Sequence, residues 1–241
     1  MDNNHKIAIE FLLWSYFGLT EEDKKETIIE RCIRLAYSDA TNQGAYNTRK
    51  KESIKYSPKF ISDCIGNLRG NSDYDKWHEQ SCKKIVNQFG DEKFTYGNAQ
   101  KWLNMTVKYL FIVNSIIEML DADASKGFQE FYNEKFKNHE ESFHVPIDSY
   151  IIESLWEENE KTENAQIWLS GAKGIKNGTL GAYSTEKYKV WSKFEGGDYR
   201  KISDYIKKNK IKESGSPMEW ENENWIKVAK ARRDNKIKKD K

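Results

Sequence analysis

Apolar residues recur along this chain at spacings of three and four, a pattern typical of amphipathic α-helices. The pattern predicts one helix over residues 6–17 and a second that begins at Thr20, an N-cap followed by acidic residues. No segment keeps the strict alternation of a half-buried strand. We therefore expect an all-α fold. The same pattern predicts further helices over residues 58–69, 74–89, 98–120, 125–136, 149 onward, 183–194, 198–211 and 220–231.

The predicted helix over 98–120 is apolar around most of its circumference. A helix of this kind is buried, so we expect it at the centre of a single helical domain that covers residues 1–241. Its one polar stripe consists of Lys101, Asn104 and Lys108, which share a helix face.

Charge decides little about the partners of the chain as a whole. The 40 Lys and Arg residues nearly balance 38 Asp and Glu residues, which leaves a formal net charge of +2. A nucleic-acid surface would therefore have to come from local clustering. The C-terminal tail, residues 227–241, is such a cluster, because only Asp234 and Asp240 oppose its many Lys and Arg residues.

The cysteines and histidines predict neither a disulfide framework nor a metal site. The cysteines are odd in number and form no CxxC pair, which favours a reducing, cytoplasmic compartment. These residues are Cys32, Cys64 and Cys82. The histidines at positions 5, 78 and 139 have no partner at a metal-ligand spacing, so we expect no cofactor. Because Glu10 interrupts the apolar run near the N-terminus, we also expect no signal peptide or membrane span.

A first candidate motif is the turn Gly97-Asn98-Ala99-Gln100-Lys101, which opens the central helix. The free N–H groups of a helix N-terminus can bind a phosphate. The same positive field disfavours the ammonium form of a lysine in the first turn, as a Schiff-base nucleophile requires. The alternative is a solvated lysine without a chemical role.

A second candidate motif is Val145-Pro146-Ile147-Asp148, followed by Ser149 and Tyr150. Pro146 keeps the preceding backbone extended, and Asp148 then stands at the start of a helix with its carboxylate near free N–H groups. The alternative is a plain helix cap.

Together the two motifs resemble the helix-hairpin-helix DNA glycosylases. Those enzymes carry a hairpin of the form L-P-G-x-G-x-K, whose lysine attacks the sugar, and a later V-P-V-D segment with the catalytic aspartate. In this chain Gly97 matches the first glycine, Lys101 matches the lysine and Asp148 matches the aspartate. Ala99 replaces the second glycine, and Thr95-Tyr96 replaces Leu-Pro. The resemblance covers about residues 75–160.

The resemblance implies a monomeric enzyme that extrudes a nucleotide from duplex DNA and excises its base, with Lys101 and Asp148 as catalytic residues. It implies further that Gly97, Asn98, Ala99 and Gln100 contact DNA. Other candidates for DNA contact are Asn104, His144 and Trp191. Candidates for an aromatic pocket are Trp102, Tyr150, Trp156 and Trp191, each of which could instead belong to the core. His144 could equally be a surface histidine.

Three functions stay open from the sequence. The first is a DNA glycosylase with lyase activity, for damaged bases or for hypermodified bases of phage DNA. The second is a non-catalytic helical module that binds DNA or protein. The third is an enzyme that acts on a nucleotide or modified base outside duplex DNA.

Overall fold

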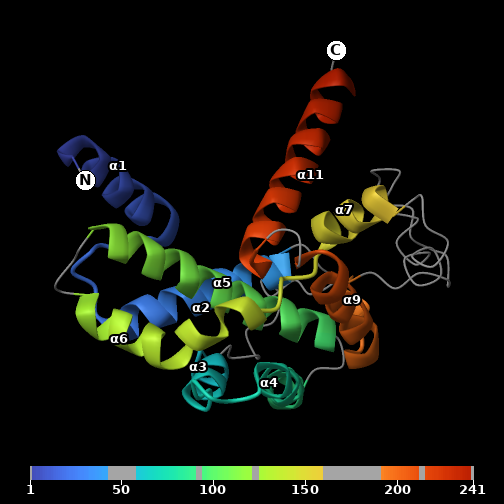
Figure 1. Cartoon of the computed structure of the whole chain (residues 1–241), viewed down its shortest axis with the longest axis horizontal. Coiled ribbons are helices and arrows are strands. Elements are labelled where there is room, and N and C mark those ends of the chain that lie inside the picture. Colours follow the sequence, from blue (N-terminus) through green and yellow to red (C-terminus); the bar gives the residue numbers. More distant parts are fainter. Residues whose placement is uncertain are drawn as a thin grey trace. The chain divides into compact units, whose positions relative to one another are not determined.

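The computed structural model describes residues 2–42, 58–90, 94–120, 125–159, 191–211 and 215–239. Within these ranges the secondary structure is helical and contains no strand, so the prediction of an all-α fold is confirmed (Figure 1). The chain divides into two compact units. The first unit comprises Met1–Phe94 and Lys101–Phe143, and the second comprises Thr95–Gln100 and His144–Lys241. The single domain expected from the sequence stays a prediction.

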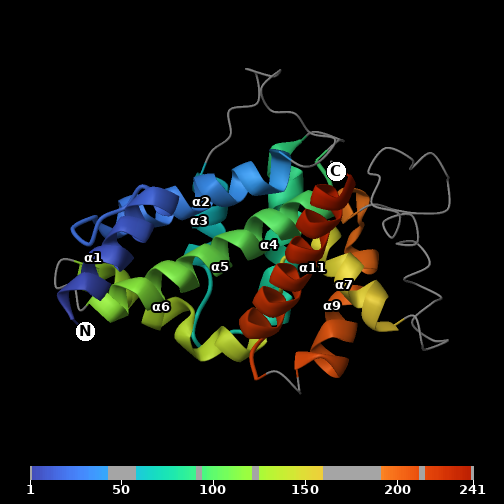
Figure 2. The ribbon, with the colours of Figure 1, turned by 90° about the horizontal axis from the view of Figure 1, so that it is seen from above.

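The first unit is built around α5 (Tyr96–Leu120), whose first residues belong to the second unit. Trp102, Leu103 and Leu110 of this helix are fully buried, as expected for a central helix. By length and composition α5 could also span a membrane, but more than half of that stretch is buried inside the protein. The other helices of this unit are α1 (Asn3–Leu12), η1 (Leu13–Phe17), α2 (Lys25–Asn42), α3 (Lys59–Gly66), α4 (Tyr74–Phe89), α6 (Lys126–Lys135) and η4 (Lys137–Ser142), and Figure 2 shows them from above.

Helix boundaries follow local side-chain chemistry. α4 begins and ends as predicted, because the Asp73 carboxylate accepts a hydrogen bond from the Lys76 N–H at 3.0 Å and Gly90 ends the helix at φ 64°. The predicted N-cap at Thr20 is wrong, since α2 begins only at Lys25. The Thr20 N–H and hydroxyl instead donate to the Asp23 carboxylate, at 2.7 and 3.1 Å, and close a separate turn.

The first predicted helix begins earlier than expected, at Asn3, and reaches its predicted end at Phe17. α1 ends at Leu12 and continues as η1, a turn of π-helix that closes at Gly18 with φ 62°. The wider turn buries Leu13 and Phe17 while Trp14 stays exposed.

The second unit contains α7 (Ser149–Asn159), the short 3₁₀ turn η7 (Trp191–Lys193), α9 (Gly196–Asn209) and α11 (Pro217–Lys239). α11 packs against α7. α11 is longer than the predicted helix over 220–231, because Pro217 suits the first helical position and the basic residues up to 239 stay helical. Most of the predicted helix over 183–194 lies outside the described residues. The core of this unit consists of Val145, Ile147, Ile151, Ile152, Leu155, Trp191, Phe194, Tyr199, Ile202, Ile206 and Trp220.

Candidate functional site

The turn that opens α5 is closed by a reciprocal cap between Thr95 and Asn98. The Asn98 side-chain oxygen accepts from the Thr95 N–H at 3.2 Å, and the Asn98 N–H donates to the Thr95 hydroxyl oxygen at 3.3 Å. α5 therefore begins at Tyr96, two residues earlier than the sequence predicts. Lys101 consequently lies beyond the first turn, where the field of the helix dipole has largely decayed.

Gly97 packs against protein backbone. Its N–H donates to the Phe194 carbonyl at 3.0 Å, and a Cβ at this position would lie only 2.0 Å from the Trp191 carbonyl oxygen. The neighbouring residues Asn98 and Ala99 are buried as well. The N–H groups of Gly97 and Asn98 thus donate to protein acceptors, and the expected phosphate contact at this turn stays a prediction.

Gln100 joins the two candidate motifs. Its side-chain nitrogen donates to the Ile147 carbonyl and to the Gly97 carbonyl, at 3.0 Å each. Its side-chain oxygen accepts from the Ile147 N–H at 3.4 Å. The side chain is fully buried and its amide is bonded within the protein, while the expected DNA contact stays a prediction. The one sequence signal for this buried role was the presence of a lone glutamine in a mostly apolar helix.

Asp148 caps α7. One oxygen of its carboxylate accepts from the N–H groups of Tyr150 and Ile151, at 2.9 and 3.1 Å. The residue is 6% exposed. A buried carboxylate held by two backbone donors has a fixed orientation, which suits both a structural cap and a catalytic group.

Two polar candidates on α5 lie in the first unit. Lys101 is 3% exposed, so the alternative of a solvated lysine is wrong. Asn104 is fully buried, and its side-chain oxygen lies 2.8 Å from the His78 Nε2, which donates to it. The predicted polar stripe therefore faces the protein interior at these two positions. The Asn104 side-chain oxygen links α5 to α4 through its hydrogen bond with His78.

His144 stands at the centre of a buried network. Its Nδ1 lies 2.8 Å from the Tyr199 hydroxyl and 3.4 Å from the Ser203 hydroxyl, and the Lys207 amine lies 3.0 Å from its Nε2. His144 is 7% exposed, and the alternative of a surface histidine is wrong. The network anchors α9 to the segment that precedes Asp148.

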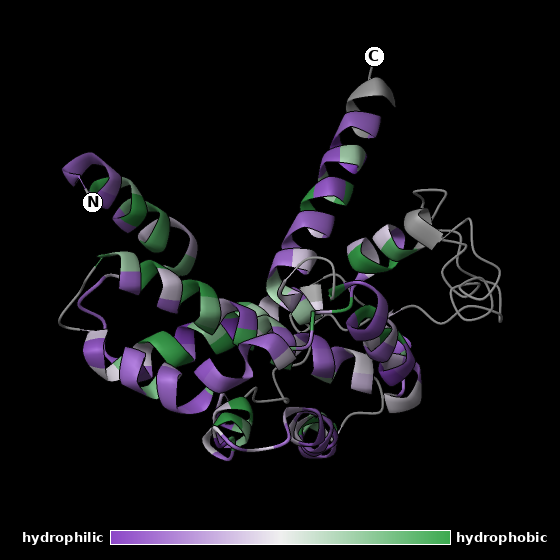
Figure 3. Cartoon of the chain, viewed as in Figure 1, coloured by the Kyte–Doolittle hydropathy of each residue, from purple (hydrophilic) through white to green (hydrophobic). Residues whose placement is uncertain are grey.

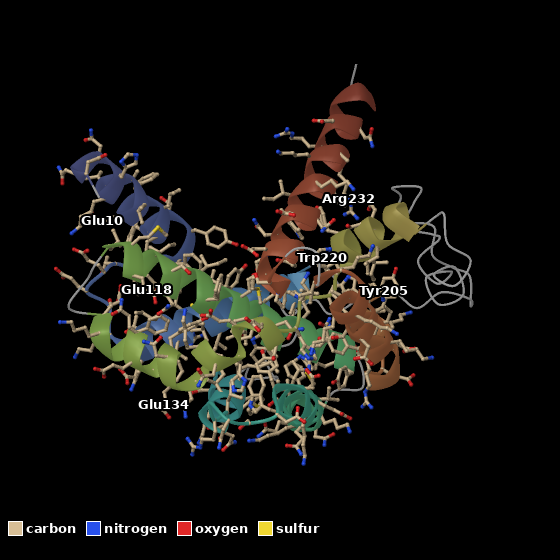
Figure 4. The ribbon with its side chains drawn as sticks, viewed as in Figure 1. Glu10, Glu118, Glu134, Tyr205, Trp220 and Arg232 are labelled. Carbon is tan, nitrogen blue, oxygen red and sulfur yellow. The ribbon has the colours of Figure 1, made fainter. Side chains whose placement is uncertain are left out.

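The aromatic candidates have separate surroundings. Trp102 is fully buried and its indole N–H donates to the Ile33 carbonyl at 3.0 Å, so it is a core residue of the first unit. Trp191 belongs to the core of the second unit. The side chain of Trp156 lies outside the described residues. The ring of Tyr150 stacks on that of Trp225 in α11, with the ring centroids 4.9 Å apart. The guanidinium of Arg232, which is labelled in Figure 4, lies over the Tyr150 ring.

The second unit thus brings together Gly97, Gln100, His144, Asp148 and Trp191, while Lys101 and Asn104 belong to the first unit. Among the described residues, no group of three His, Cys, Asp or Glu side chains could hold a metal ion. No protein-family model, curated protein or solved structure matches this chain.

Proposed function

We propose that this protein is a DNA glycosylase with lyase activity, which excises a damaged or hypermodified base. The link between Gln100 and Ile147 is the observation that carries the proposal, because it joins the two motifs that resemble the helix-hairpin-helix glycosylases. The residue after each partner is a catalytic candidate, Lys101 after Gln100 and Asp148 after Ile147. Both side chains are buried, and groups shielded from water interact more strongly with developing charge.

The chemistry assigns a separate task to each residue. The Lys101 amine attacks C1′ of the extruded nucleotide, and the glycosidic bond breaks as the base leaves with the electron pair and receives the proton that the lysine nitrogen loses. The Asp148 carboxylate stabilises the positive charge that develops on the sugar. The sugar ring then opens as the C1′–O4′ bond breaks, which gives an iminium between C1′ and the lysine nitrogen, and O4′ receives a proton.

One observation favours a second candidate, a non-catalytic helical module. The backbone N–H of Gly97, which would bind a phosphate in a glycosylase hairpin, instead donates to the carbonyl of Phe194. A chain that kept the helical frame of a glycosylase without its DNA contacts would show this arrangement.

Release of bases from a panel of modified duplexes separates the candidates. Asp148→Asn keeps most of the capping ability but removes the charge, so we expect an intact fold and base release lowered by about 10²–10⁴-fold. Asp73→Asn is the matched control, because Asp73 caps α4 in the same manner, and it should leave release unchanged. No release from any duplex would favour the module. Release from free nucleotides alone would favour an enzyme that acts outside duplex DNA.

A further inference from the structure

The N-terminus of the first unit carries several exposed apolar side chains. We call it the N-terminal apolar surface; the exposed fractions of its members lie between 54% and 66%. α1 contains no buried residue, and Figure 3 shows the hydrophobic positions along it. The surface consists of Ile7, Phe11, Leu12, Trp14 and Tyr16.

A short helix without a buried face, such as α1, is stabilised when it packs against a partner. α1 has 10 residues, and isolated helices of that length are marginal in water because their stability comes from packing. The base of the surface is nevertheless packed on the first unit, since Leu13 and Phe17 of η1 are buried and the Tyr16 hydroxyl lies 3.0 Å from that of Tyr109. A preformed aromatic surface of this kind loses little conformational entropy on binding.

The charges beside the surface indicate its kind of partner. The Lys6 amine forms ion pairs with Glu10, which is labelled in Figure 4, at 3.6 Å, and with Glu21, at 3.4 Å. Helices that lie on anionic membranes, and surfaces that bind nucleic acid, present unpaired Lys and Arg residues. Lys6 is already neutralised, so the surroundings suit a partner that is itself apolar and charge-balanced.

The size of the surface suits half of a symmetric interface. Its three aromatic side chains alone expose roughly 300–450 Å², about half of the roughly 800 Å² that each partner buries in a standard interface. We propose that a second copy of this chain covers it, through pairing of α1 and η1 with the same elements of the partner about a two-fold axis. This interface is independent of the proposed enzymatic function and differs from the monomer that the sequence suggested.

Sedimentation of the full chain over a range of concentrations tests the dimer. The parent protein should form a concentration-dependent dimer, and Phe11→Glu should raise the dimer dissociation constant tenfold or more because it buries a charge at the centre of the interface. Ile226→Glu is the matched control, since Ile226 is also exposed but belongs to α11. It should leave the dimer unchanged.

A cross-linking experiment tests the symmetry without disturbing the surface. At a two-fold interface a residue near the axis meets its own copy. Ser15→Cys should therefore give a dimer with a short bis-maleimide linker, whereas Ser62→Cys, at an exposed position of α3, should not. The native cysteines are buried. A parent protein that is monomeric at all concentrations, or one that binds anionic vesicles through Phe11, would overturn the proposal.

Discussion

The side chain of Gln100 and the backbone of Ile147 form two hydrogen bonds across 47 positions of sequence. An amide side chain that both donates to a carbonyl and accepts from the N–H of the same residue fixes that residue in position and orientation. This pair holds the segment that leads to Asp148 against the first turns of α5. It therefore fixes the position of the Asp148 segment within the second unit.

Replacement of Gln100 should weaken both the fold and the chemistry. Gln100→Leu leaves the Ile147 N–H and carbonyl buried without these partners, so we expect a loss of about 1–3 kcal/mol in the free energy of unfolding. We also expect base release to fall, because the Asp148 segment loses its anchor. Urea denaturation and a release assay measure the two effects. Gln80→Leu, at an exposed position of α4, should change unfolding by less than about 0.5 kcal/mol.

Gly97 should tolerate no side chain. Gly97→Ala would place a Cβ 2.0 Å from the Trp191 carbonyl oxygen, so the two backbone segments must separate. We expect a loss of about 1–3 kcal/mol, the cost typical of overpacking. Gly127→Ala in α6 is the control, because nothing lies within 4 Å of its Cβ, and it should not destabilise. Equal thermal midpoints for the two variants would show that the contact at Gly97 is absent in solution.

Stability should fall at alkaline pH through Cys32. Burial raises the pKa of the Cys32 thiol well above its ordinary value, so the folded protein keeps a proton that the unfolded chain releases. The contribution is complete below about pH 8.5, where unfolded cysteine is protonated, and above that pH it is lost at up to about 1.4 kcal/mol per pH unit. Urea denaturation at pH 7.5 and 9.5 measures the loss. Cys32→Ala should show a smaller loss between the two pH values, and an equal one would contradict this account.

Local signals in the sequence were sufficient for several helices. Asp73 and Gly90 bound α4 because a cap and a left-handed glycine act within one turn. The start of α5 was misplaced, since Asn98 resembles an N-cap but lies at the third helical position, where it completes the cap of Thr95.

The surroundings of the site residues depend on distant partners and could not be predicted. The acceptor for the Gly97 N–H is Phe194, and the partners of His144 lie on α9. Periodicity alone assigns a polar residue to a solvated face. It does not detect a buried partner from another helix, such as His78 for Asn104.

Trapping of the protein on abasic DNA tests the proposed function most directly. Borohydride reduces the iminium between lysine and sugar to a stable amine, so the parent protein should form a covalent adduct with an abasic duplex, mapped by mass spectrometry to Lys101. Lys101→Gln should form none, provided that circular dichroism shows an intact fold. Lys108→Gln, on the same helix, should retain the adduct. An adduct of undiminished yield with Lys101→Gln, or none with the parent protein, would contradict the assignment of Lys101 as the nucleophile.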